Sequence, residues 1–215
     1  IVLKNEKERK MRDLMKKLVS AIFLASSLVF LTACNASTAA QIGDTKISTQ
    51  DVQSRISEIL SERSKYDTSG MQLSTGEELN RSEMRFLVVA TIFEKIAAKN
   101  GIKITQAMKD AKKAEIYNSL GGQTQLGTAL VSAQLAPSDF DIYIQAVLIS
   151  EKLQERAIAA GIDQANAGAA IQQLISEFSN SEKIVINPQF GKWDVSAADL
   201  VTFDSAGTAV KPITA

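Results

Sequence analysis

Few residues of this chain are of the types that perform chemistry. It contains one cysteine, Cys34, and no histidine among its 215 residues. The lack of histidine removes the commonest general base, the Ser-His and Cys-His nucleophile pairs, and most zinc sites. No Ser-x-x-Lys signature occurs, and the glycine-rich stretch 121–127 lacks the Lys-Ser/Thr pair of a phosphate-binding loop. We therefore expect no enzyme activity, no catalytic residue, no metal, no cofactor and no bound nucleotide.

Two aspartates that flank Phe140, Asp139 and Asp141, come nearest to a metal-binding pair. They stand at the expected start of a long helix, where the helix dipole stabilises negative side chains. Glu77 and Glu78 occupy the same kind of position in an earlier helix. The pattern favours charges matched to helix termini over a metal site.

Cys34 directly follows a segment that has the pattern of an export signal. Residues 18–31 are uncharged, follow a pair of lysines, and are too few for a membrane-spanning helix of about 20 residues. The next residues, Leu31-Thr32-Ala33-Cys34, resemble the lipobox of bacterial lipoproteins. This resemblance implies signal cleavage between Ala33 and Cys34 and lipidation of the Cys34 thiol, palmitate being a typical acyl chain. A buried cysteine and an ordinary secretory signal are the alternatives.

Four segments follow from this interpretation. Residues 1–33 form the signal peptide with an upstream extension, 34–39 a lipidated tether, 40–194 a folded domain, and 195–215 a flexible C-terminal tail. Translation is expected to start at Met11 or Met15. Without residues 1–33 the chain keeps 17 basic and 21 acidic residues and has no basic run, so we expect no nucleic-acid partner. The lipid on Cys34 would hold the protein on the extracytoplasmic face of the cell membrane.

Hydrophobic periodicity predicts a mainly helical domain of about six helices. Ser48, Thr105 and Asp163 have the positions of N-terminal caps for three of them. The segment 86–93 is apolar all round, which predicts a place at the centre of the domain. The expected helices cover about 49–66, 77–99, 105–120, 124–135 and 139–160, and a last one follows Asp163.

Two short segments have the alternation or composition of strands. Residues 40–48 alternate apolar and polar side chains about a Gly43-Asp44 turn, and residues 183–186 are mostly branched and apolar. A strand this short cannot satisfy its own backbone. We therefore expect Gln41-Ile42 to pair with residues 183–186, in a small two-stranded element that joins the two ends of the domain.

Three motifs follow one another along the chain: the opening turn at 42–48, the apolar helix and its exit at 85–105, and the closing Asn-Pro-Gln-Phe-Gly-Lys-Trp-Asp at 187–194. Taken in this order, they resemble the motifs of SurA-type chaperones. The last is similar to a segment of SurA-like lipoproteins of high-GC Gram-positive bacteria, which implies an actinobacterial-type envelope. The chain departs from the family at Ile42, where an asparagine is usual. It also has neither the histidines nor the length for the parvulin prolyl isomerase domain that SurA and PrsA often insert.

The resemblance implies the chaperone module alone, of the SurA, PrsA and trigger-factor type. Its expected function is a non-catalytic holdase that binds unfolded or extended polypeptides, without prolyl isomerase activity. The alternative is an adaptor lipoprotein that binds one folded partner in the cell envelope. Helices 86–93 and 140–149 carry more apolar surface than a single stripe requires, which favours a groove left open between them. The sequence does not identify which residues bind a polypeptide. Trp193 either stacks on a ligand or packs against the core.

Overall fold

The structure is a computed structural model that describes residues 37–202. The expected cleavage and lipidation site, Ala33 and Cys34, therefore lies outside the described residues, as do residues 203–215. The described part is mainly helical with small β-sheets, which confirms the expected fold class. Within it, no helix is long and apolar enough to cross a bilayer. Its α-helices are α2 (Thr49–Arg63), α3 (Gly76–Lys99), α4 (Gln106–Leu120), α5 (Leu126–Ala133), α6 (Phe140–Ala159) and α7 (Ala167–Ser181).

Two of the three expected helix caps form. The Ser48 hydroxyl accepts a hydrogen bond from the Asp51 backbone N–H at 3.0 Å, and the Thr105 hydroxyl accepts one from Met108 N–H at 3.3 Å. The expectation for Asp163 is wrong. A 3-10 turn, η3 (Gln164–Asn166), intervenes before α7, and the backbone carbonyl of Asp163, not its carboxylate, accepts from the Asn166 N–H.

A three-stranded antiparallel sheet joins the two ends of the domain in the order β2-β1-β3. The expected pairing is confirmed: Gln41 faces Val185 and Ile42 faces Ile184, while the Gly43 N–H donates to the Lys183 carbonyl at 2.9 Å. The sheet has one strand more than expected because both arms of the 40–48 hairpin join it. Its strands are β1 (Thr38–Ile42), β2 (Thr45–Ser48) and β3 (Ile184–Ile186).

The expected boundaries of the domain are wrong at both ends. Thr38 and Ala39 belong to β1 rather than to a tether, and Ala39 is fully buried. After Asp194 the chain does not become a tail but turns back, so that β4 (Lys192–Asp194) pairs with β5 (Asp199–Val201). The Asp194 carboxylate accepts from the Ser196 and Ala197 N–H groups and thereby fixes the turn. Trp193 packs against the main hydrophobic core.

Gly191 makes this second hairpin possible. Its φ of 122° lies in a region that side chains rarely adopt, and a Cβ on it would lie 2.4 Å from the Val201 carbonyl oxygen. The preceding 3-10 turn, η4 (Pro188–Phe190), buries Phe190 in the core. The closing motif of the sequence, residues 187–194, therefore forms a 3-10 turn and the first strand of a hairpin.

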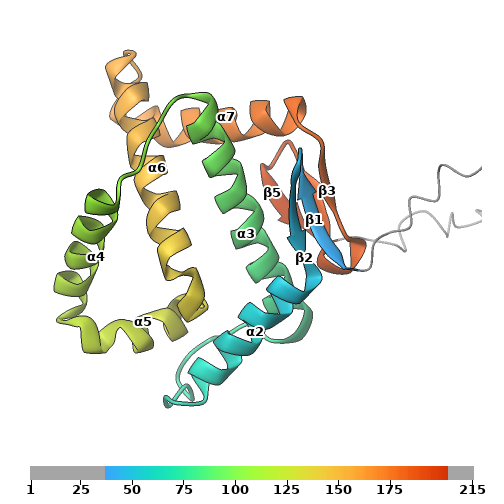
Figure 1. Ribbon diagram of the computed structural model, residues 1–215, viewed down its shortest axis with the longest axis vertical. Coiled ribbons are helices and arrows are strands. Elements are labelled where there is room, and N and C mark those ends of the chain that lie inside the picture. Colours follow the sequence, from blue (N-terminus) through green and yellow to red (C-terminus); the bar gives the residue numbers. More distant parts are fainter. Residues whose placement is uncertain (1–36, 203–215) are drawn as a thin grey trace, which may run out of the picture. The chain divides into compact units, whose positions relative to one another are not determined.

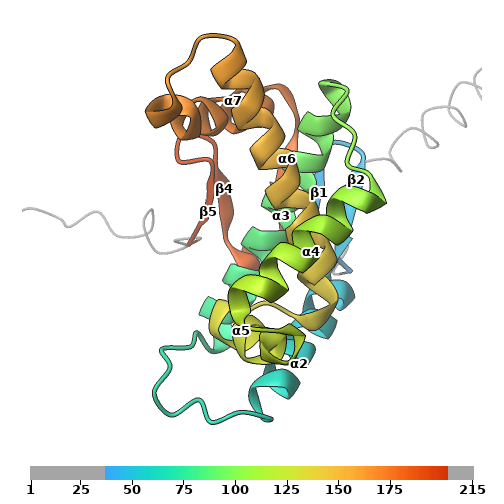
Figure 2. The same ribbon diagram turned by 90° about the vertical axis from the view of Figure 1, so that its left-hand side faces the viewer.

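The main core surrounds α3. The sheet packs along one side of this helix, and α2 and α7 pack near its two ends. In Figure 1, α3 stands between the strands and α6. A second, smaller cluster contains Leu130, Phe140, Ile144 and Leu148 and holds α4 and α5 against α6. Figure 2 shows α4, α5 and α6 in front of α3. We call α4 and α5 with the turn η1 (Gln123–Gln125) the arm.

The central place expected for residues 86–93 is only half right. Leu87, Val88, Ala90 and Ile92 are buried. The remaining apolar side chains of this segment are only partly buried, because the arm and α6 do not close over them. These are Phe86, Val89 and Phe93.

Candidate functional site

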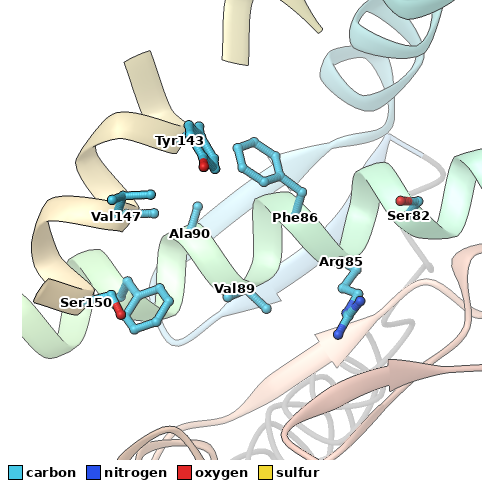
Figure 3. A pocket seen from close by; sticks show the side chains of 10 residues that line it. Ser82, Arg85, Phe86, Val89, Ala90, Tyr143, Val147 and Ser150 are labelled. Carbon is cyan, nitrogen blue, oxygen red and sulfur yellow. The ribbon is translucent and has the colours of Figure 1, made fainter. Parts of the chain in front are cut away.

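An open apolar groove of about 430 Å³ lies between α3 and α6. We call it the α3–α6 groove. Figure 3 shows Phe86 of α3 and Tyr143 of α6 side by side across it, with Val147 to the left of Ala90. Its lining is contributed by Ser82, Arg85, Phe86, Val89, Ala90 and Phe93 of α3 and by Tyr143, Ala146, Val147 and Ser150 of α6.

Helical spacing explains why these side chains share the groove. Val89 and Ala90 each lie three or four residues from both Phe86 and Phe93, which places all four on one side of α3. The lining residues of α6 have the same spacing, from Tyr143 to Ser150. Two apolar helix sides thus face each other without closing completely, and Tyr143 remains 42 % exposed.

A second cavity of about 440 Å³ opens next to the groove, between α3, the arm and the start of α6. We call it the arm pocket. It shares Ser82, Phe86 and Tyr143 with the groove, so the two hollows are continuous. The rest of its wall is mostly aliphatic or aromatic and is contributed by Glu83, Ile116, Ser119, Leu120, Leu126, Ala129, Leu130, Ala133, Gln134, Leu135 and Phe140.

Arg85 marks one rim of the groove. It forms an ion pair of 2.5 Å with Asp199 of β5 and points from α3 toward the C-terminal strands in Figure 3. The hairpin that the sequence pattern missed therefore contacts the groove wall. Because the Arg85 side chain is 59 % exposed, this pair contributes little to stability and mainly positions β5.

A carboxyl group, that of Glu83, is buried where α3 meets α2 and the turn η2 (Pro137–Asp139). Glu83 is 2 % exposed. Burial raises its pKa from 4.5 to about 7; the positive charge of Arg55 opposes this rise, and the negative charge of Glu58 adds to it. Its Oε1 atom has no hydrogen-bond partner within residues 37–202.

The neighbours of Glu83 are already engaged. Arg55 of α2 forms an ion pair with Asp139 of η2, which is fully buried. Glu58 accepts a hydrogen bond of 3.2 Å from the Ser138 backbone N–H. The cluster thus ties α2 to η2, while Glu83, beside the arm pocket, forms no ion pair within the described part of the chain.

The residues that the sequence singled out do not assemble into one site. Asp139 pairs with Arg55, whereas Asp141 pairs with Lys113 of α4 at 2.5 Å, so the two aspartates do not converge. Glu77 and Glu78 lie in the first turn of α3, as expected. Among the described residues, no group of three or more Cys, Asp or Glu side chains is placed to hold a metal ion.

Sequence reasoning did not name the residues of the groove, although it held a signal for them. The segments 86–93 and 140–149, which carry the surplus apolar surface, include seven of the ten side chains that line the groove. Glu83 gave no such signal, because it lies in the mostly polar first part of a helix, residues 76–85, and a glutamate in such a segment is usually exposed.

Comparisons of the chain with protein-family models, curated proteins and solved structures found no match.

Proposed function

We propose that this protein is a lipid-anchored, non-catalytic holdase that binds apolar segments of exported or unfolded polypeptides in the α3–α6 groove and the arm pocket. The membrane anchor of the proposal is the lipid on Cys34. The resemblance to SurA-type chaperones supports the same proposal from the sequence. No nucleotide cycle and no prolyl isomerase activity belong to it.

The observation that carries the proposal is the continuity of two open apolar hollows on one side of α3. Open apolar surface of this kind is characteristic of a binding site. The walls offer few polar groups, so contacts would be made to client side chains of many shapes. Since an unfolded client loses several kcal/mol of conformational entropy when it is ordered, binding should be weak and reversible.

The test of the holdase proposal is suppression of client aggregation, measured by light scattering. We would use the mature protein with Cys34→Ser, which cannot be acylated, and a thermally unfolding client without ATP. Suppression at near-stoichiometric ratio is expected. Tyr143→Ala, which removes a side chain shared by both hollows, should weaken it several-fold.

Ile158→Ala is the matched control for Tyr143→Ala. Ile158 is 44 % exposed, close to the 42 % of Tyr143, and lies on the same helix but lines neither hollow. It should suppress aggregation as well as the unsubstituted protein. If aggregation continues at several-fold excess and a pull-down returns one folded partner, the adaptor function replaces the holdase.

The anchor is tested separately by metabolic labelling with a fatty-acid probe. Cys34→Ala should abolish labelling and leave the precursor uncleaved or released from the membrane. Labelling that survives this substitution contradicts lipidation at Cys34, without bearing on the groove.

A further inference from the structure

The arm pocket has one charged group in an otherwise apolar or neutral wall. Of the 14 side chains that line it, Glu83 alone carries a charge when ionised near neutral pH. Leu120 of α4, with Leu126 and Leu130 of α5, supplies aliphatic surface. A cavity of about 440 Å³ is large enough for a long side chain and part of its neighbour.

Glu83 forms no ion pair within residues 37–202. It is 2 % exposed, and its Oε1 atom accepts no hydrogen bond from the described residues. Arg55 is held by Asp139, and Arg63 donates to the Ser74 carbonyl at 2.7 Å and to the Gln134 side chain at 2.9 Å. An unmet buried acceptor costs about 1–3 kcal/mol, which a donor from a ligand would recover.

The charges around Glu83 favour a cationic donor. Besides Arg55, which is paired, Glu58 of α2 and Asp139 of η2 are both negative, so an added cation meets no net positive field. Hydrogen bonds to charged groups contribute about 1.5–3 kcal/mol, against about 0.5–1.5 for neutral pairs. Lysine and arginine also have apolar stems that pack on aliphatic walls while the charged end reaches a polar group.

We propose that the arm pocket takes a lysine or arginine side chain of the bound polypeptide, whose terminal cation pairs with the Glu83 carboxylate. This inference rests on the proposed function and defines its preferred client: an apolar extended segment that carries a basic residue. The stem would lie along Leu120, Leu126 and Leu130.

The pairing has a characteristic pH dependence, because Glu83 must lose its proton to attract a cation. The charged or titratable groups near it are Arg55 and Glu58 on α2, Asp139 on η2 and Tyr143 on α6. With a pKa of about 7, the carboxyl is mostly protonated at pH 6 and mostly ionised at pH 8. The affinity for a basic peptide should therefore rise about tenfold over this range, and that for a neutral peptide should not change.

The experiment compares two short fluorescent peptides of leucine and valine with one variable central residue. That residue is lysine in one peptide and norleucine, which keeps the stem and lacks the charge, in the other. Fluorescence anisotropy measures binding to the mature Cys34→Ser protein at pH 6 and pH 8. Glu83→Gln tests the carboxylate, and Glu78→Gln is the control because Glu78 is an exposed carboxylate of the same helix outside both hollows.

At pH 8 the lysine peptide should bind about tenfold more tightly than the norleucine peptide to the unsubstituted protein and to Glu78→Gln. Glu83→Gln should remove this preference and its pH dependence while still binding the norleucine peptide. Equal binding of both peptides to the unsubstituted protein, or a preference that Glu83→Gln retains, overturns the inference and leaves the holdase proposal standing. If neither peptide binds, the holdase proposal fails as well.

Discussion

On one side of α3, Met84, Val88 and Ile92 have no exposed surface, whereas on the opposite side Phe86 and Phe93 are only partly buried. The two sides have similar composition. They differ in what covers them: the sheet, α2 and α7 close over the first, while α6 and the arm leave hollows over the second. The comparison shows that an apolar helix side indicates where another element should pack, but not whether that packing is complete. Among residues 37–202, it is complete on one side of α3 only.

The largest difference between the two sides should appear in stability. Ile92→Ala removes a fully buried side chain from the main core and should lower the free energy of unfolding by about 2–5 kcal/mol. Val89→Ala, on the groove side, should cost less than about 1 kcal/mol because its side chain is already partly in water. Urea unfolding of both variants measures this contrast, and equal losses would contradict the distinction between a closed and an open side.

Glu83 lies between the two sides and should make stability depend on pH. Its pKa is raised from 4.5 to about 7 by burial, so the folded protein binds the proton more tightly than the unfolded chain does. The resulting stabilisation is complete below pH 4.5, falls as the pH rises toward 7, and totals about 3 kcal/mol.

Glu83→Gln should remove this dependence. Relative to the unsubstituted protein, the variant should gain about 3 kcal/mol between pH 4.5 and pH 7 and then stay constant. Urea unfolding across this pH range measures the difference, in which the contributions of other carboxylates cancel. Parallel stability curves would mean that Glu83 is not desolvated in the folded state.

The arm should unfold locally more easily than the main core does. None of the residues of α4 is fully buried, and its contact with α6 includes a tilted aromatic pair of Tyr117 and Phe140 with ring centroids 6.1 Å apart. Tyr117→Ala should cost about 1 kcal/mol and speed amide hydrogen exchange in α4 and α5 but not in β1 and β3. Uniform acceleration across all elements would show that the arm and the main core open together.

The smallest effect on stability is expected for a surface ion pair at the C-terminal end of α3. Lys99 and Glu182 form an ion pair of 2.6 Å, and the Lys99 side chain is 54 % exposed. Because solvent and salt screen such a pair, Glu182→Gln should change stability by less than about 0.5 kcal/mol. Thermal unfolding at low and high salt provides the measurement. A loss comparable with that of Ile92→Ala would contradict the view that burial, not surface charge, holds this end.

Local signals predicted most of the elements. Ser48 with Asp51, and Thr105 before its helix, specify caps through contacts three residues apart, so neighbouring sequence suffices to locate them. The β1–β3 pairing followed from two strand-like segments that each needed a partner. The β4–β5 hairpin was missed because each strand is only three residues long, which leaves no alternation to recognise.

The sequence by itself determined the helices, the pairing of β1 with β3, and the amount of apolar surface on residues 86–93 and 140–149. Each depends on side chains that are neighbours along the chain or on a backbone that must be hydrogen-bonded. Tertiary structure alone decided which of that surface stays open and that Glu83 is buried beside it with no ion-pair partner among residues 37–202. Both depend on how α2, α6 and η2 pack against α3, and helix periodicity carries no information about the packing of distant segments.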